Sequence, residues 1–430
     1  MNYQERLLKV IPGGAHTYSR GYDQYPSNAP QILTRGKGAY VFDPEGNKYL
    51  DYGMALRAVN IGYAEDEIDQ AAIKQIRSGN NLTRPSMIEL EAAELLVELI
   101  DSVDMVKFTK NGSTAVSAAV KLARAYTGRE LVARCAEQPF FSFDDWFIGS
   151  TPLTRGIPQE TIEKTKMFRY NDITSLEDLI AQYPGQFACV VLEPATTEKP
   201  KDGFFQSIQT LCLKHGIVFV LDEMITGFRW HMKGAQYTYG ITPDLCTFGK
   251  AMANGYSVSC VAGRREIMKL GSIEFEGSER VFLLSTTHGA EMSGLGAFVA
   301  TINFMRQNKV VEHLWSYGNR LIDMLQSRAL GYGISQSFRV GGIPCSPYYL
   351  TLDESGANSL ALRTLFAQEM IRHGVLMPWV SLSYRHGEEE LAVTERAIDQ
   401  AFAVYARAFT EGVDKYLKGE VIKPVFRKFN

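Results

Sequence analysis

The sequence lacks the features that would mark a secreted, membrane or nucleic-acid-binding protein. Its 430 residues include six cysteines without a CxxC pair, which predicts neither a disulfide framework nor a zinc site. No apolar run approaches the roughly 18 residues of a membrane span, and the first residues lack the apolar core of a secretory signal. Lys and Arg number 45 against 48 Asp and Glu, so the net charge is −3, and no basic run would attract nucleic acid or anionic lipid. We therefore expect a reduced, soluble, cytoplasmic protein.

Several common enzyme motifs are missing as well. No GxGxxG follows a strand and opens a helix, and no GxxxxGK[ST] is present, which argues against dinucleotide and P-loop sites. The sequence has no HExxH or His/Cys cluster for a catalytic metal, and no GxSxG turn for a serine nucleophile. We therefore expect no metal and look for chemistry elsewhere.

Composition and periodicity predict an α/β protein of two or three domains. The hydrophobic fraction of 45% and the charged fraction of 22% are typical of a globular chain. Residues 1–56 read as an arm with a β-hairpin at 39–51, around a PEGN turn. We assign 57–310 to a large domain and 311–430 to a smaller α+β domain, with helices predicted at 310–327 and 388–409.

Helix-like and strand-like segments alternate within the large domain. We predict helices at 87–100, 113–127, 175–182 and 205–215. Short apolar, β-rich runs predict strands at 105–108, 131–133, 188–192, 217–221, 245–248 and 259–262. This alternation is typical of βαβ units, so we expect a mainly parallel sheet covered by helices on both faces. Ligands of such sheets bind beyond the carboxyl ends of the strands.

Two turns at helix starts are candidate phosphate sites. Asn111, Gly112, Ser113 and Thr114 follow the strand at 105–108 and begin a helix, whose first N–H groups and hydroxyls suit a phosphate. The same residues also suit an ordinary helix cap. The run STTH at 285–288 precedes a helix of small residues and has the same two interpretations.

Two further strand ends carry charged residues. Asp222 and Glu223 follow the apolar run at 217–221, where a partly buried carboxylate can pair with a cation or a protonated ring nitrogen. A strand-end acid can also merely cap the next turn. Lys250 follows the run at 245–248 among small residues, and desolvation there lowers the pKa of an amine toward that of a usable nucleophile. Such an amine can form a Schiff base with a carbonyl.

Together these segments predict a site for pyridoxal 5'-phosphate. The cofactor requires a Schiff-base lysine, an acidic partner for its pyridinium nitrogen and donors for its phosphate. Lys250, Asp222 and the turn at 111–114 supply one of each. Asp222 would keep the ring nitrogen protonated, and Lys250 would act as general base and acid.

The sequence resembles the class III aminotransferases of fold type I over nearly its whole length. The resemblance rests on LDEMITGFR, on TFGKAMANG followed by GRREIM, and on NGSTAVSAAVKLARAYTGR, in this order and spacing. The group it most resembles is that of the glutamate-1-semialdehyde 2,1-aminomutases. The implied fold is a large domain with a mainly parallel sheet, plus a smaller α+β domain.

The resemblance also implies roles for individual residues. It implies Lys250 and Asp222 as the catalytic pair, and it implies cofactor contacts from Gly112, Ser113, Thr114, Phe140, Glu193 and Met224. Thr287 resembles the threonine that reaches the phosphate of the neighbouring subunit, so a homodimer with shared active sites is implied. The substrate-binding positions implied are Arg20, Thr17, Glu198 and Glu291.

Departures from the aminomutase pattern fall on the substrate side. Phe140 stands where a Tyr-His-Gly turn usually stacks on the cofactor ring, so the phenolic hydroxyl is missing. Glu291 replaces an asparagine, Thr17 replaces a serine, and Tyr18 and Ser19 replace a Pro-Val pair beside Arg20. These changes leave the cofactor residues intact and weaken the aminomutase assignment.

The preferred hypothesis is an aminotransferase that moves an amino group from an amino acid, glutamate by default, to a small carbonyl acceptor. Glu291, Glu198 and the aromatic cluster at 140–146 suit a hydroxylated or sugar-like acceptor. The alternative is an aminomutase that moves the amine within one substrate. A non-catalytic protein of the same fold is disfavoured because Lys250 and Asp222 are both present.

Overall fold

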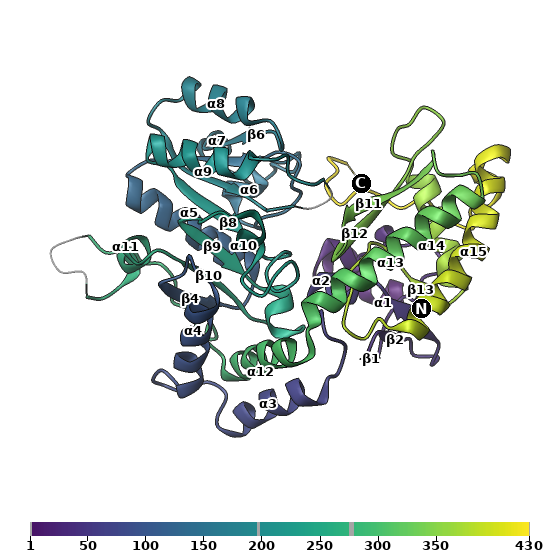
Figure 1. Cartoon of the computed structure of the whole chain (residues 1–430), viewed down its shortest axis with the longest axis horizontal. Helices are drawn as coiled ribbons and strands as arrows, with labels where there is room; N and C mark the ends of the chain where they lie inside the picture. The colour runs from purple at the N-terminus through teal and green to yellow at the C-terminus, as the bar shows by residue number, and fades with distance from the viewer. Residues whose placement is uncertain (1, 196–197, 275–278, 430) are drawn as a thin grey trace. The chain divides into compact units, whose positions relative to one another are not determined.

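The computed structural model describes residues 2–195, 198–274 and 279–429 (Figure 1). The chain divides into two compact units. The first unit contains the chain up to Glu65 together with Glu312–Arg427, and the second contains Asp66–Val311. Where we expected an arm at 1–56 and a border at 310/311, the unit borders follow Glu65 and Val311, and the N-terminal segment folds with the C-terminal residues.

A seven-stranded sheet forms the centre of the second unit, in the order β4-β10-β9-β8-β7-β5-β6. Only β10 is antiparallel to its neighbours, and the remaining pairs are parallel, which confirms the predicted mainly parallel sheet. Five strands are buried along their whole length, which explains their continuous apolar runs. The strands are β4 (Met105–Thr109), β5 (Leu131–Cys135), β6 (Thr165–Phe168), β7 (Phe187–Leu192), β8 (Val218–Asp222), β9 (Leu245–Phe248) and β10 (Ser259–Gly263).

The two faces of this sheet bury different partners. On one face, Phe219 and Leu221 of β8 join an apolar core with α8 (Ile173–Gln182) and α9 (Phe204–His215). Because side chains alternate along a strand, Val218, Val220 and Asp222 point to the opposite face. The helix α5 (Gly112–Thr127) packs against β7, β8, β9 and β10.

Other helices of the second unit connect these elements. The helix α12 (Met292–Asn308) packs on α3 (Asp66–Arg77) and α4 (Met87–Leu99), and Figure 1 shows α12 and α3 side by side. Helix α3 and strand β6 are not among the predicted elements. Polar and charged residues make up much of both segments, so neither has a long apolar run. The shorter helices are α6 (Asp145–Ile148), α7 (Gln159–Glu163), α10 (Ala235–Tyr239), α11 (Arg265–Met268) and the 3₁₀ turns η4 (Lys250–Ala253) and η5 (Lys269–Gly271).

The first unit is an α+β assembly. Its larger sheet has the order β1-β2-β3-β13, and its smaller sheet pairs β11 with β12. The hairpin predicted at 39–51 is present as the antiparallel pair β2–β3. The elements are β1 (Arg35–Lys37), β2 (Tyr40–Phe42), β3 (Lys48–Asp51), β11 (Phe338–Ile343), β12 (Ser346–Thr351), β13 (Val375–Leu376), α1 (Tyr3–Val10), α13 (Val310–Gly331), α14 (Leu360–Arg372) and α15 (Glu388–Glu411).

A left-handed turn follows β3 in this unit. Four successive residues without a glycine, the α2 segment (Met54–Arg57), have φ values between 41° and 68°. Left-handed backbone costs about 1–2 kcal/mol per residue, so the surroundings must hold the turn. Asp51 accepts hydrogen bonds from the N–H groups of Gly53 (2.7 Å) and Met54 (3.1 Å), and Trp379 Nε1 donates to the Gly53 carbonyl (3.1 Å).

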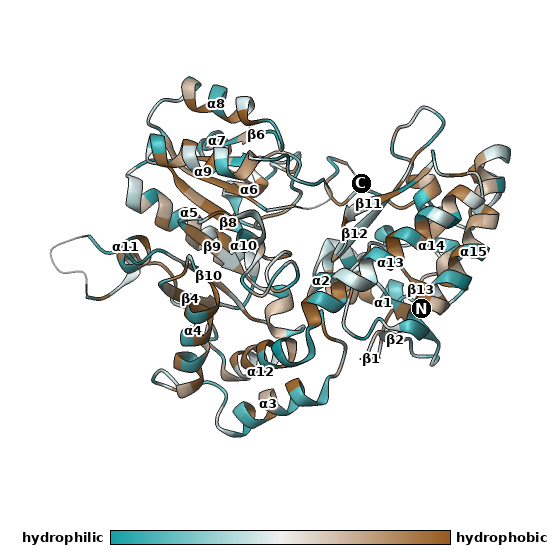
Figure 2. Ribbon diagram, in the orientation of Figure 1, coloured by the Kyte–Doolittle hydropathy of each residue, from teal (hydrophilic) through white to brown (hydrophobic). Residues whose placement is uncertain are grey.

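Hydropathy follows burial in both units. Figure 2 shows brown, apolar strands in the central sheet of the second unit. All six cysteines are buried free thiols, as expected for small apolar side chains. Within the described residues, no helix is both long enough and apolar enough to span a bilayer, and no group of acidic, His and Cys side chains is arranged to hold a metal.

Two leucine-to-alanine changes test the core assignment. Leu176 on α8 is fully buried in the core, whereas Leu213 on α9 is 81% exposed. We expect Leu176→Ala to lower the free energy of unfolding by about 2–5 kcal/mol, and Leu213→Ala to change it by less than about 0.5 kcal/mol. Urea unfolding followed by circular dichroism measures both, and equal effects would contradict the assigned core.

Candidate active site

The parallel register of β8 and β9 brings Asp222 and Lys250 together. Asp222 at the end of β8 pairs in register with Thr247 of β9, whose hydroxyl donates to the Asp222 carboxylate (3.0 Å). The Met224 N–H donates to the same oxygen (2.9 Å). Burial raises the pKa of Asp222 above its ordinary value, and the nearby charge of Lys250 is the largest opposing influence. The site therefore holds a desolvated carboxylate close to a lysine.

Lys250 occupies a conformation that few lysines adopt. It begins the 3₁₀ turn η4 with a φ of 45°, in the left-handed region, directly after Gly249. Its side chain is half-buried, and the three residues that follow it in η4 are fully buried. The cost of this backbone conformation, of order 1 kcal/mol or more, is typical of residues held at functional sites.

Met224 joins the three segments that carry the predicted cofactor residues. It follows β8, and it is 95% buried between Gly249 and the turn at 111–114, called the phosphate turn below after its predicted role. A Cβ added at Gly112 would lie 2.8 Å from Met224 Sδ, and one added at Gly249 would lie 2.6 Å from the same atom. A larger residue at either position would therefore overlap the thioether unless Met224 moved. Met224 thus has a packing role beside the predicted cofactor contact.

The turn between β4 and α5 has the form of a capped helix start. Asn111, not Ser113 or Thr114, is the cap: its side-chain oxygen accepts from the Thr114 N–H (2.9 Å) and the Thr114 hydroxyl (3.0 Å). Helix geometry gives the N–H groups of Gly112 and Ser113 no intrahelical acceptor, so they remain suited to an anion. The two interpretations of this turn are therefore compatible.

A second set of contacts aligns neighbouring strand ends. The Gln138 side chain pairs with the backbone of Glu193, donating to its carbonyl and accepting from its N–H at 2.7 Å each. Glu193 itself is buried directly after β7. Phe140 is 47% exposed with its ring edge-on to Phe147, while the adjacent Phe141 is buried. Phe140 therefore offers an accessible ring face near the end of β5.

Glu223 is a structural carboxylate rather than a ligand for substrate. Its buried oxygens accept from the Thr226 hydroxyl (2.6 Å), the Ala235 N–H (2.7 Å) and the Gln236 N–H (3.0 Å). These bonds close the loop between β8 and α10. Because Glu223 adjoins Asp222, this anchoring also fixes the end of β8.

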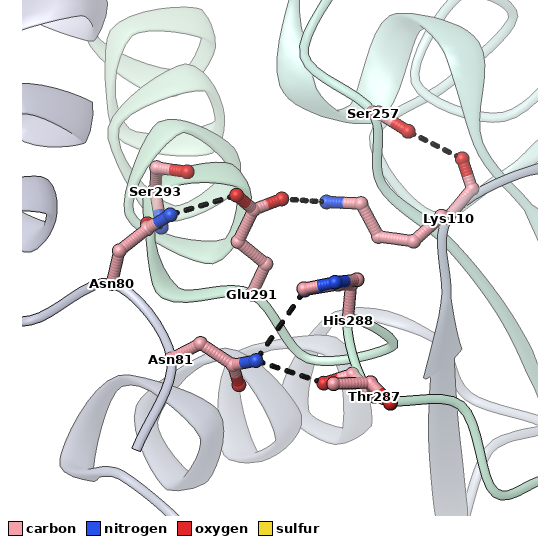
Figure 3. Close-up of polar contacts among 8 residues, drawn as sticks. All are labelled: Asn80, Asn81, Lys110, Ser257, Thr287, His288, Glu291 and Ser293. Carbon is pink, nitrogen blue, oxygen red and sulfur yellow. Dashed lines mark hydrogen bonds and ion pairs between the residues drawn. The ribbon is translucent and has the colours of Figure 1, made fainter.

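Glu291, at the end of the turn 285–291, contacts Lys110, the residue before Asn111 (Figure 3). Glu291 accepts from Lys110 Nζ (2.6 Å) and from Asn80 Nδ2 (2.7 Å), and both bonds lower the pKa of Glu291 below its usual range. Thr287 is exposed, and its carbonyl accepts from Asn81 Nδ2 (3.0 Å). The carboxylate predicted to bind substrate thus already has two protein donors.

The remaining predicted substrate residues fall into different units. Glu198, in the second unit, is exposed and accepts from Asn171 Nδ2 (2.9 Å). Arg20 and Thr17 lie in the first unit, where the Arg20 N–H donates to the Thr17 carbonyl (2.9 Å). Arg20 lines a cavity of about 890 Å³ within that unit, together with Tyr25, Tyr63 and Trp379 among other residues.

Arg20 keeps its charge available. Within the described residues, its guanidinium has no hydrogen-bond or carboxylate partner. Burial raises the pKa of Tyr25 to about 12 and also raises that of Tyr63, and the nearby charge of Arg20 opposes both changes. This cation beside aromatic rings in a cavity suits an anionic ligand group.

Two residues that shape the site are not singled out by the sequence. Thr247 orients Asp222, and Gln138 holds the backbone of Glu193. Thr247 left a signal, since it is a polar residue inside an otherwise apolar strand. Gln138 left none, because its partner is the backbone of a residue 55 positions away.

The donor set fits pyridoxal 5'-phosphate. A buried carboxylate beside a half-buried lysine matches a pyridinium partner and an attached amine. The open N–H groups at the start of α5 match the phosphate. All these groups lie in the second unit.

Comparisons with known proteins cover almost the whole chain. A family model for aminotransferase class-III matches residues 21–402. A 3-aminobutyryl-CoA aminotransferase of Cloacimonas acidaminovorans (strain Evry) is 31% identical over 413 residues, which cover 94% of this chain and 96% of the relative. The solved FumI protein of Sphingopyxis sp. MTA144, which carries pyridoxal phosphate, is similar with a TM-score of 0.86 at 27% identity, over 95% of this chain and 96% of FumI. A glutamate-1-semialdehyde aminomutase of Pseudomonas aeruginosa PAO1 shares the fold, with a TM-score of 0.82 at 19% identity over 93% of each chain.

A double-mutant cycle tests the contact between Gly112 and Met224. We expect Gly112→Ala alone to lower the free energy of unfolding by about 1–3 kcal/mol, because the new methyl group overlaps the buried thioether. In a Met224→Ala background the same change should cost less than about 0.5 kcal/mol, since the overlapping atom is gone. Equal costs in the two backgrounds, measured by urea unfolding, would show that Met224 does not fill this space.

Proposed function

This chain belongs to the class-III aminotransferase family and is a pyridoxal-phosphate-dependent aminotransferase, and on that premise we propose which residues perform the reaction and on what substrate. When bound, the cofactor supplies an electron sink for the carbon that loses its proton. We assign Lys250 Nζ as the amine that attaches the cofactor and then takes up and returns a proton. Asp222 holds a proton on the ring nitrogen, and the backbone N–H groups of Gly112 and Ser113 bind the phosphate.

The environment of each residue supports these roles. The carboxylate of Asp222 is kept in place by Thr247 and the Met224 N–H, so its orientation does not depend on the ligand. Burial raises the pKa of Asp222. A cationic ring nitrogen beside it would lower that pKa and would thereby favour the ionised carboxylate. Phe140 offers its exposed ring for stacking, and Glu193 and Thr114 complete the cofactor contacts.

We propose glutamate as one amino donor and a 3-amino or 3-oxo acyl compound as the other substrate. The hydroxylated, sugar-like acceptor loses its support, because Glu291 and Glu198 already accept from Lys110, Asn80 and Asn171. The guanidinium of Arg20, which has no side-chain partner among the described residues, favours an acid or other anionic group, with Thr17 beside it in the chain fold. The relative at 31% identity acts on an amine at the 3-position of an acyl group, by its name.

The intramolecular aminomutase reaction is the alternative. Its support is the likeness in fold to the Pseudomonas enzyme, which at 19% identity carries no substrate assignment. Phe140, Tyr18 and Ser19 depart from the aminomutase pattern on the substrate side. Intermolecular transfer therefore remains our proposal.

We also propose a homodimer in which Thr287 serves the neighbouring subunit. Four large apolar side chains between residues 76 and 90 are each more than half exposed: Ile76, Leu82, Met87 and Leu90. This segment carries Asn80 and Asn81, which hold the turn of Thr287. Exposed apolar side chains of this density are typical of subunit interfaces, and a second copy would cover them. The six free thiols suit the reducing cytoplasm.

The first experiment is a visible spectrum of the holoenzyme with candidate amines. We expect L-glutamate and a 3-amino acyl compound, such as 3-aminobutyrate or its coenzyme A thioester, each to bleach the cofactor band of the wild type. Lys250→Ala should lower the turnover rate by about 10³-fold or more, because it removes the group that moves the proton.

The controls separate the competing assignments. Lys233→Ala removes a lysine whose partner is the exposed Asp101, and it should leave the spectrum and turnover unchanged. Conversion of glutamate-1-semialdehyde without any response to glutamate would favour the aminomutase, and turnover of a keto sugar would restore the hydroxylated acceptor.

A mixed dimer tests the role of Thr287. Lys250→Ala and Thr287→Ala subunits are each expected to give defective homodimers. If Thr287 acts across the interface, a dimer of one of each contains one intact site, with Lys250 from one subunit and Thr287 from the other. We expect mixing to restore up to about half of the wild-type turnover per dimer. No restoration in isolated mixed dimers would show that Thr287 serves its own subunit.

A further inference from the structure

Glu291 links the phosphate turn to the turn that carries Thr287. Its ion pair with Lys110 joins the residue just before Asn111 to the N-cap residue of α12, and neither partner is more than 29% exposed. The backbone of Lys110 is fixed separately, since its carbonyl accepts from the Ser257 hydroxyl (2.5 Å). The side chain of Lys110 is therefore aimed at Glu291 from a rigid strand end (Figure 3).

Asn80 and Asn81 hold the other side of this turn. Asn80 caps α12 from a distant segment, because its carbonyl accepts from the Met292 N–H (2.8 Å) and its side-chain oxygen from the Ser293 N–H (3.0 Å). Its amide also donates to Glu291 (2.7 Å). Asn81 donates to the Thr287 carbonyl and lies 3.4 Å from His288 Nδ1. Together these contacts hold both ends of the segment 287–293.

We propose that Lys110, Glu291, Asn80 and Asn81 form a positioning network that sets the location of Thr287, and so the affinity for pyridoxal phosphate, without touching the cofactor. The inference rests on the proposed phosphate contacts of Gly112, Ser113 and Thr287. The network is particular to this chain, because it depends on a carboxylate at position 291, where the sequence departs from the aminomutase pattern. Glu291 thereby has a role that is distinct from binding substrate.

The network also determines where the charge of Lys110 lies. Lys110 adjoins the phosphate turn, yet its ammonium pairs with Glu291 at 2.6 Å. Were the ammonium itself a phosphate ligand, removal of Glu291 would release it and tighten cofactor binding. A positioning role predicts the opposite sign, so one substitution distinguishes the two.

The test measures the dissociation constant of pyridoxal phosphate from the purified protein, by cofactor absorbance, together with the melting temperature of the apoprotein. We expect Glu291→Gln and Lys110→Met each to weaken binding about tenfold, the size of effect typical of residues that orient a ligating group. Lys110→Arg, which keeps the cation, should stay within about twofold of the wild type. The spectrum of the bound cofactor should not change, because Lys250 and Asp222 are untouched.

Two comparisons isolate positioning from general stability. Glu98→Gln breaks another ion pair that reaches α12, between Glu98 and Arg306 (3.0 Å), and should leave cofactor affinity unchanged. In a Thr287→Ala background, Glu291→Gln should weaken binding no further, because the residue that it positions is already absent.

Several outcomes would overturn the proposal. These are unchanged or tighter binding in Glu291→Gln, a full additional loss in the Thr287→Ala background, or a loss matched by Glu98→Gln. If Glu291→Gln does not yield soluble protein, Lys110→Met breaks the same ion pair from the other side. The proposed function is judged separately, by the response of the wild-type spectrum to amines, so its failure would not be confused with failure of this network.

Discussion

The desolvated carboxylate of Asp222 is the group on which the rest of the site depends. A buried charge without a partner is strongly unfavourable, so the surroundings must supply donors and a cation. The β8–β9 register supplies Thr247, the following turn supplies the Met224 N–H, and the end of β9 supplies the charge of Lys250. The same strand pairing therefore both stabilises the carboxylate and brings it to the lysine.

Left-handed backbone without glycine is found in each of the two units. Lys250 has left-handed backbone next to a glycine that cannot be enlarged, because a Cβ at Gly249 would lie 2.5 Å from Ser259 Oγ. The turn Met54–Arg57 is left-handed throughout and depends on the buried Asp51. Strain of this kind persists only where well-packed surroundings impose it. Ala55 and Leu56 of this turn line the same cavity as Arg20.

The sequence points to Asp222 and Lys250 because each closely follows an apolar run. Such runs identify buried parallel strands, and chain topology then brings their carboxyl ends to one edge. Residues that act through partners distant in the sequence carry no such signal. The partners of Glu291, Lys110 and Asn80, lie 181 and 211 positions away, so no sequence pattern predicts this ion pair and hydrogen bond. The left-handed turn at 54–57 contains no glycine that would have suggested it.

The division into units explains why the cofactor is easier to assign than the substrate. The assigned cofactor residues lie in one continuous stretch of chain, whereas Arg20 lies in a unit built from both ends of the chain. There, Asp23 pairs with Arg427 (2.7 Å) and accepts through its carbonyl from the Lys423 N–H (2.9 Å), so the C-terminal segment helps to form the cavity wall near Arg20. Changes in either terminal segment can reshape this cavity while Asp222, Lys250 and their supports stay the same. The cavity beside Arg20 can therefore change while the cofactor residues stay the same, which is why the motifs identify the chemistry more directly than the substrate.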